Sequence, residues 1–77
     1  MKVTLRFARA IKELYEHLDE EIEITLEKGA TVRDAMDATN LPKGAWGILL
    51  TDERICKMDE EVFDGQIIIV LPPVSGG

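Results

Sequence analysis

The chain has 77 residues, 45% of them hydrophobic and 31% charged, and a formal net charge of −6. Such a chain forms one folded domain, too small for a deep active site, and its acidity disfavours binding to nucleic-acid phosphates. No apolar run approaches the roughly 18 residues of a membrane span, and the N-terminus lacks the apolar core of a signal peptide. We therefore expect a cytoplasmic protein that binds neither nucleic acid nor membranes. Its acidity either attracts basic protein partners or serves solubility alone.

The N-terminal third of the chain predicts a strand, a short helix and a second strand. Val3, Leu5 and Phe7 alternate with polar residues, which is the period of a strand with one buried face. From residue 9 the apolar spacing becomes that of an amphipathic helix, with Ile11, Leu14, Tyr15 and Leu18 on one side. Alternation returns over residues 22–26, so a second strand follows, with an acidic face open to water.

The remainder of the domain predicts one more helix and three further strands. Thr31-Val32-Arg33-Asp34 resembles a capping box and opens a helix that ends by Asn40. After a loop over residues 41–46, strands are expected over residues 46–50, 54–58 and 67–71. The order of elements indicates an α+β fold, in which one main helix covers one face of a mixed sheet of four to five strands.

The last predicted strand, Ile67 to Leu71, is apolar at every position. Strands of this kind are normally buried on both faces. Because a helix on one side of the sheet covers only half of these side chains, we expect Ile68 and Val70 to remain uncovered and to bind a partner. The alternative is that the loop over residues 41–46 or the first helix covers them.

Motifs for independent catalysis are missing from the sequence. It contains no phosphate-binding loop, no nucleophile elbow and no His/Cys cluster with metal-ligand spacing. We therefore expect no metal site, no bound cofactor and no active site of the chain's own. Cys56 is expected to be a small core residue, and His17 a solvated side chain.

The C-terminal segment Pro72-Pro73-Val74-Ser75-Gly76-Gly77 is the part of the sequence that points to function. Two prolines terminate the preceding strand and hold the chain in a stiff, extended form. Six extended residues reach at most about 20 Å, enough to thread a narrow channel in a partner. Glycines at the end allow close approach and leave the terminal carbonyl open to attack. We expect a folded domain over residues 1–71 and a flexible, projecting tail over residues 72–77.

This tail, preceded by Asp64-Gly65 and a β-branched run, resembles that of the ubiquitin-like sulfur carriers, the family of MoaD and ThiS. The resemblance extends weakly to Val3-Leu5-Phe7-Ala8 and to Gly29-Ala30-Thr31-Val32. It implies a β-grasp fold, a choice among α+β folds that the sequence pattern alone does not make. The Pro72-Pro73 lead-in is closer to MoaD, the small subunit of molybdopterin synthase, than to ThiS.

The same resemblance implies the chemistry. A ubiquitin-activating-like adenylyltransferase of the MoeB type would use ATP to adenylate Gly77, and a sulfur donor would convert the adenylate to a thiocarboxylate. In the MoaD branch the sulfur passes to a molybdopterin precursor held in the large, MoaE-type synthase subunit. Gly77 would then carry the reacting carboxylate, Gly76 would provide steric clearance, and Pro72, Pro73, Val74 and Ser75 would form the threaded lead.

Three other functions remain open. A ubiquitin-like modifier would form isopeptide bonds through Gly77, a ThiS-like carrier would supply sulfur for the thiamin thiazole, and a plain interaction domain would not need its last two residues. The sequence also departs from the MoaD pattern, since Leu50-Thr51-Asp52-Glu53 stands in place of a Val-Asn-Gly-like turn. The sulfur recipient and the metal of the final cofactor, molybdenum or tungsten, are therefore open.

Overall fold

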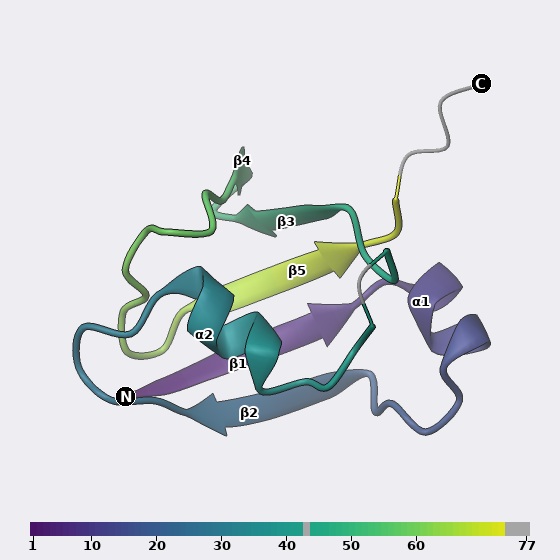
Figure 1. Cartoon of the computed structure of the whole chain (residues 1–77), viewed down its shortest axis with the longest axis horizontal. Helices are drawn as coiled ribbons and strands as arrows, with labels where there is room; N and C mark the ends of the chain where they lie inside the picture. Colours follow the sequence, from purple (N-terminus) through teal and green to yellow (C-terminus); the bar gives the residue numbers. More distant parts are fainter. Residues whose placement is uncertain (43, 74–77) are drawn as a thin grey trace.

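Five strands form one mixed sheet in the computed structural model, which describes residues 1–42 and 44–73 (Figure 1). The strands are β1 (Lys2–Phe7), β2 (Glu21–Thr25), β3 (Ile48–Thr51), β4 (Arg54–Ile55) and β5 (Ile67–Leu71). Their order across the sheet is β2-β1-β5-β3-β4. β5 lies in the centre, parallel to β1 and antiparallel to β3, so the last strand is held on both sides. The expected mixed sheet is therefore confirmed.

Two short helices complete the described elements. α2 (Val32–Asp37) crosses one face of the sheet, and α1 (Arg9–Leu14) lies beyond the end of β1 (Figure 1). The predicted capping box is present: the Thr31 hydroxyl accepts from the backbone N–H of Asp34, whose carboxylate accepts from the N–H of Thr31. α1 ends before the predicted apolar stripe does, so Ile11 is buried while Leu14 is 73% exposed. No helix of the described ranges is long and apolar enough to span a membrane.

The core lies between α2 and the face of the sheet that it covers, called here the inner face. Val3 and Leu5 of β1 point into it and are fully buried, together with Val32 and Ala35 of α2. Half-buried apolar side chains of β2 complete this layer. The alternation read from the sequence thus buries the predicted face of β1.

The expectation that Ile68 and Val70 form an uncovered face is wrong, because both side chains are completely buried. In the parallel pairing, Ile68 lies beside Leu5 and Val70 beside Phe7, so they share the inner face with the apolar side of β1. The other side of β5 carries Ile67, which is 44% exposed, and the half-buried Ile69 and Leu71. β5 therefore has one uncovered side, as expected, but this side carries Ile67, Ile69 and Leu71 instead of Ile68 and Val70.

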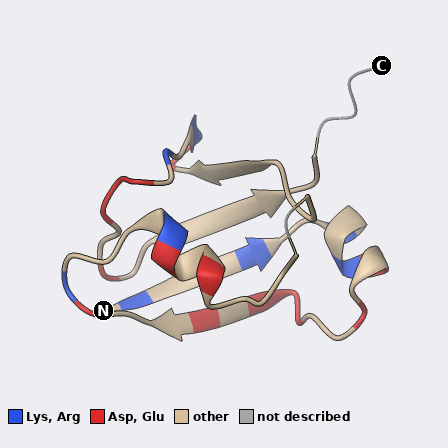
Figure 2. Cartoon of the chain, viewed as in Figure 1, with Lys and Arg blue, Asp and Glu red and all other residues tan. Residues whose placement is uncertain are grey.

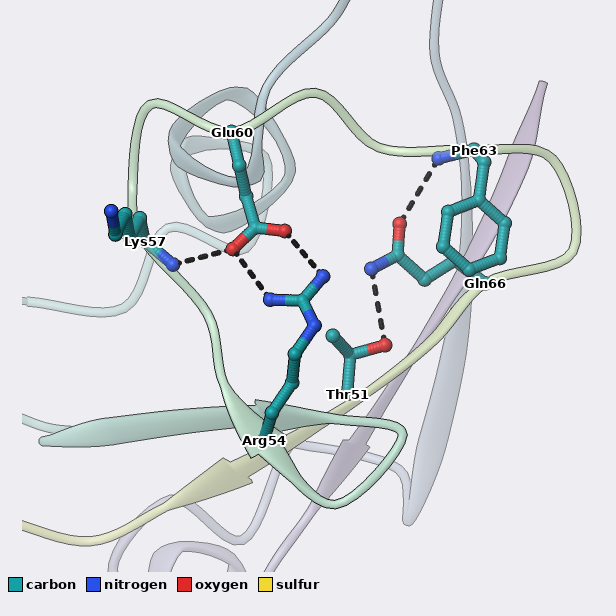
Figure 3. A network of polar contacts seen from close by, with 6 residues as sticks. All are labelled: Thr51, Arg54, Lys57, Glu60, Phe63 and Gln66. Carbon is teal, nitrogen blue, oxygen red and sulfur yellow. Dashed lines mark hydrogen bonds and ion pairs between the residues drawn. The ribbon is translucent and has the colours of Figure 1, made fainter.

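The segment between β4 and β5 is held by polar contacts rather than by regular structure (Figure 3). Arg54 donates two hydrogen bonds to the Glu60 carboxylate, at 3.0 and 2.7 Å, and the backbone N–H of Lys57 donates a third at 2.6 Å. The hydrogen bond from Arg54, followed by that from Lys57, lowers the pKa of Glu60 to about 2. The carboxylate therefore stays charged and keeps the loop closed at neutral pH.

A buried amide connects the same segment to β3. Gln66 is only 1% exposed; its side-chain N–H donates to the Thr51 hydroxyl at 3.1 Å, and its carbonyl accepts from the Phe63 backbone at 3.0 Å (Figure 3). Both polar ends of the amide are thereby satisfied, as burial requires. These bonds fix the residue immediately before β5 and so the start of the central strand.

Cys56 is buried and His17 is exposed, as expected, but the strand ends before Cys56 and the helix before His17, although both were predicted to include them. Cys56 is a buried free thiol just after β4, which ends at Ile55 instead of reaching residue 58. Burial raises the pKa of the Cys56 thiol, so it stays protonated and packs as a core side chain. His17 is exposed.

Candidate functional site: the end of β5 and the outer face of the sheet

The site begins where β5 ends. The carbonyl of Val70 accepts from the N–H of Ala8 at 3.0 Å, and the carbonyl of Leu71 accepts from the N–H of Gly47 at 2.9 Å. Pro72 and Pro73 then offer no N–H for a further ladder bond. The strand is therefore anchored to both neighbours up to Leu71 and stops there.

Pro72 is half-buried and Pro73 is exposed, so the chain has reached the surface at Pro73. The backbone of these two prolines lies against Gly47, in the turn that leads into β3. The predicted site residues Val74, Ser75, Gly76 and Gly77 lie outside the described residues. The described part of the site is thus the base of the tail, held at the end of an anchored central strand.

Beside this base, apolar side chains collect on the side of the sheet opposite α2. Strand pairing places Ile48 opposite Leu71, and Leu50 opposite both Ile69 and Ile55. Directly paired residues point to the same side of a sheet, so these side chains form one surface. We call this surface the outer apolar face; its residues are Ile48, Leu50, Ile55, Ile67, Ile69 and Leu71.

The outer apolar face is accessible to a partner. Ile55 is 64% exposed and Ile67 44%, whereas the inner-face neighbours Ile68 and Val70 are 0% exposed. Leu71 links this face directly to Pro72, so the surface continues to the base of the tail. A partner that receives the tail would meet this face at once.

Charges border the face on the side of β1 and β2 (Figure 2). Arg6 of β1 pairs in register with Ile69 on one side and with Glu21 on the other, and its guanidinium lies 3.3 Å from the Glu21 carboxylate. This exposed ion pair contributes little to stability. Glu23 adds a second exposed carboxylate to β2, the edge strand. The outer side of the sheet thus changes from apolar on β3 and β5, through the basic Lys2 and Arg6 of β1, to acidic on β2.

Clusters of metal-ligating side chains and buried polar side chains without partners are both absent from the described residues. Within residues 1–42 and 44–73, no group of three or more His, Cys, Asp or Glu side chains could hold a metal ion. No buried side-chain nitrogen or oxygen in the same ranges lacks a hydrogen-bond partner. What the described site presents is an anchored strand end beside an exposed apolar surface.

The sequence predicts a site that includes the tail base, Pro72 and Pro73, but it does not reveal most of the outer apolar face. Ile48, Leu50 and Ile55 were placed on predicted strands without a face assigned, and Ile67, Ile69 and Leu71 were assigned to the covered side. The exposure of Ile55 in the two-residue strand β4 is visible only in the structure. Gly47 carried no signal at all, because its contact with Pro73 joins the residue before β3 to the chain after β5, and the two are distant in sequence.

The fold and the site together define the class. A mixed sheet with its first and last strands side by side and parallel in the centre, crossed by a helix and ending in an anchored strand, is the β-grasp fold of ubiquitin-like proteins. The ThiS family model matches residues 6–77, and the chain belongs to this family. It is thus a member of the ubiquitin-like group of sulfur carriers and modifiers.

Solved structures agree with this assignment. The chain is similar to SAMP1 from Haloferax volcanii, with a TM-score of 0.77 and 19% identity over 100% of both chains. It is also similar to a putative molybdopterin converting factor subunit 1 from Pyrococcus furiosus, with a TM-score of 0.74 and 26% identity over 96% of this chain and 99% of that chain. A third similar chain comes from the complex of subunits 1 and 2 of the molybdopterin-converting factor from Helicobacter pylori. Its TM-score is 0.67 and its identity 22%, over 100% of this chain and 100% of that chain. A search of curated protein sequences finds no match.

Proposed function

We propose that this protein is a sulfur carrier whose Gly77 carboxylate is converted to a thiocarboxylate and delivers sulfur in molybdopterin biosynthesis. The observation that carries the proposal is the anchored end of β5: a central strand, bonded to both neighbours up to Leu71, leads through Pro72-Pro73 to a sequence that ends in Gly76-Gly77. The molybdopterin branch is supported by the 26% identity with the P. furiosus protein named for that pathway.

Activation of Gly77 requires a second protein. A carboxylate is ionised at neutral pH and is a poor electrophile. In the proposed series of reactions, a MoeB-type adenylyltransferase binds ATP. An oxygen of the Gly77 carboxylate attacks the α-phosphorus of ATP and releases pyrophosphate. A donor at the oxidation level of hydrosulfide then adds to the acyl carbon and displaces AMP, which leaves the thiocarboxylate and a proton. The carrier itself supplies the tail and the surface that docks it, and binds no cofactor.

The recipient of the sulfur is a molybdopterin precursor held by a MoaE-type large subunit. We assign its docking surface to the outer apolar face, which continues through Leu71 into the base of the tail. The H. pylori complex of subunits 1 and 2 shows that a protein of this fold forms such an assembly. A large subunit with an apolar centre would complement the face, and basic groups further out would complement the carboxylates of β2, which lie on the far side of β1 from the face.

The experiment that tests this proposal is an intact-mass measurement after incubation with ATP, an activating enzyme and a sulfide donor. Full-length protein is expected to gain the mass difference between one sulfur and one oxygen, whereas a chain lacking Gly76-Gly77 should not change. Addition of the large subunit and the precursor should return the mass to its starting value as molybdopterin forms. Adenylation without any sulfur gain would contradict the proposal.

A second candidate is a protein modifier joined to lysines through Gly77. It is favoured by the match to SAMP1, which is described as a small archaeal modifier protein. Conjugates would be detected as Gly-Gly remnants on lysines of other proteins after proteolysis. A third candidate is a carrier that supplies sulfur for the thiamin thiazole. It would form the same thiocarboxylate but pass the sulfur to a different recipient, so the transfer step of the intact-mass assay distinguishes it from a molybdopterin carrier.

A further inference from the structure

Gly47 makes a close backbone contact with the base of the tail. Its N–H donates to the carbonyl of Leu71 at 2.9 Å, which brings the chain before β3 alongside the end of β5. A Cβ atom at Gly47 would lie 2.6 Å from the Cα of Pro73, 3.1 Å from the carbonyl oxygen of Pro72 and 3.2 Å from the nitrogen of Pro73. The contact therefore leaves no room for any side chain at this position.

Neither partner of this contact can yield easily. All three neighbouring atoms belong to the proline backbone, and no flexible side chain is available to move aside. The pyrrolidine rings fix φ at both prolines, so rotation about φ there cannot relieve the strain of an added Cβ. A side chain at residue 47 would instead displace Pro72-Pro73 as a unit.

The backbone conformation of Gly47 does not itself require glycine. Positive φ angles occur at Gly29, Gly44 and Gly65, whereas the φ angle of Gly47 lies outside the left-handed region that favours glycine. Gly47 is also exposed, so no core packing restricts its size. The contact with Pro73 is thus the one constraint in the described structure that accounts for glycine at this position.

We propose that Gly47 is a positioning residue that sets the direction in which the tail leaves the domain. The inference rests on the proposed function, in which the Gly77 carboxylate must reach a reacting group inside each partner. The outer apolar face fixes how the domain docks, and the Gly47–Pro73 contact fixes where the tail starts relative to that face. A displacement of about 1 Å at a reacting group can cost about 100-fold in rate.

The variant Gly47→Ala tests this role in adenylation by the activating enzyme, followed as ATP–pyrophosphate exchange. Because the outer apolar face is unchanged, KM for the carrier should stay within about threefold, whereas kcat should fall by about 10- to 100-fold through misplacement of the carboxylate. Gly47→Val should lower kcat further. Thermal unfolding should show both variants folded, since residue 47 is exposed and needs no positive φ.

Gly29→Ala is the matched control. Gly29 has a φ of +93°, and no atom lies within 4 Å of the place that a Cβ would take, so alanine there strains the backbone without touching the tail. It should lower the melting temperature and leave kcat unchanged.

Two results would overturn the inference alone: wild-type kcat in Gly47→Ala, or an equal loss of kcat in Gly29→Ala, which would trace the effect to stability. Absence of adenylation in the wild type would overturn the proposed function and this inference with it.

Discussion

Leu50 of β3 and Ile69 of β5 lie opposite each other, and both side chains point to the side of the sheet away from α2. Their inner-face neighbours, Leu49 and Val70, are also register partners and are buried. The two central strands therefore carry apolar side chains on both sides, but only one side is covered within residues 1–42 and 44–73. This asymmetry leaves an uncovered apolar surface, to which we assign the docking of a partner.

Ile55→Glu and Ile67→Glu are each expected to weaken binding of the large subunit by about tenfold or more while the domain stays folded. Both residues are exposed in the free chain, Ile55 by 64% and Ile67 by 44%, so a carboxylate there is hydrated until a partner covers it. Titration calorimetry measures the affinity. Ala38→Glu, an exposed position at the end of α2, is the matched control and should bind as the wild type does. Unchanged affinity in both isoleucine variants would exclude this face.

The inner side of β5 should respond in the opposite way. Ile68→Ala removes a completely buried side chain and should lower the free energy of unfolding by about 2–4 kcal/mol. Ile67→Ala, on the exposed side of the same strand, should cost less than about 1 kcal/mol. Urea denaturation compares the two. Equal losses would contradict the assignment of the two faces.

The Arg54–Glu60 contact should make stability depend on pH in the acid range. The folded-state pKa of Glu60 is about 2, below its ordinary value of 4.5, so its stabilising effect is complete above about pH 4.5 and is lost as the pH falls towards 2. Glu60→Gln should therefore melt at a lower temperature than the wild type at pH 7, and the two melting temperatures should converge near pH 2. A gap that persists at pH 2 would mean that the carboxylate charge is not responsible.

The turn between β3 and β4 contains avoidable strain. Asp52 and Glu53 both have positive φ angles, 49° and 66°, as in the two-residue hairpin turns that favour glycine. Glu53→Gly should raise the free energy of unfolding by about 0.5–1 kcal/mol, or the melting temperature by about 2–8 °C. Differential scanning calorimetry would detect this gain. Glu53→Ala removes the same carboxylate without relieving the strain and should show no gain.

Local signals in the sequence determined most of the elements. Alternation over residues 2–7 sets β1 because a period of two matches only an extended chain with one buried side. Thr31 and Asp34 set the start of α2 because their side chains bond to backbone groups three residues away. The prolines set the end of β5 because they lack the donors that would continue it. Each of these causes acts within a few residues.

The tertiary structure alone decided which side of β5 is buried and what the base of its tail lies against. An apolar strand has no polar residue to mark its outer side, so the pairing of Ile68 with Leu5 settles the choice, and that pairing joins the two ends of the chain. The contact of Gly47 with Pro73 likewise exists only after β3 has paired with β5. Both features depend on long-range register, and no local pattern of residues encodes it.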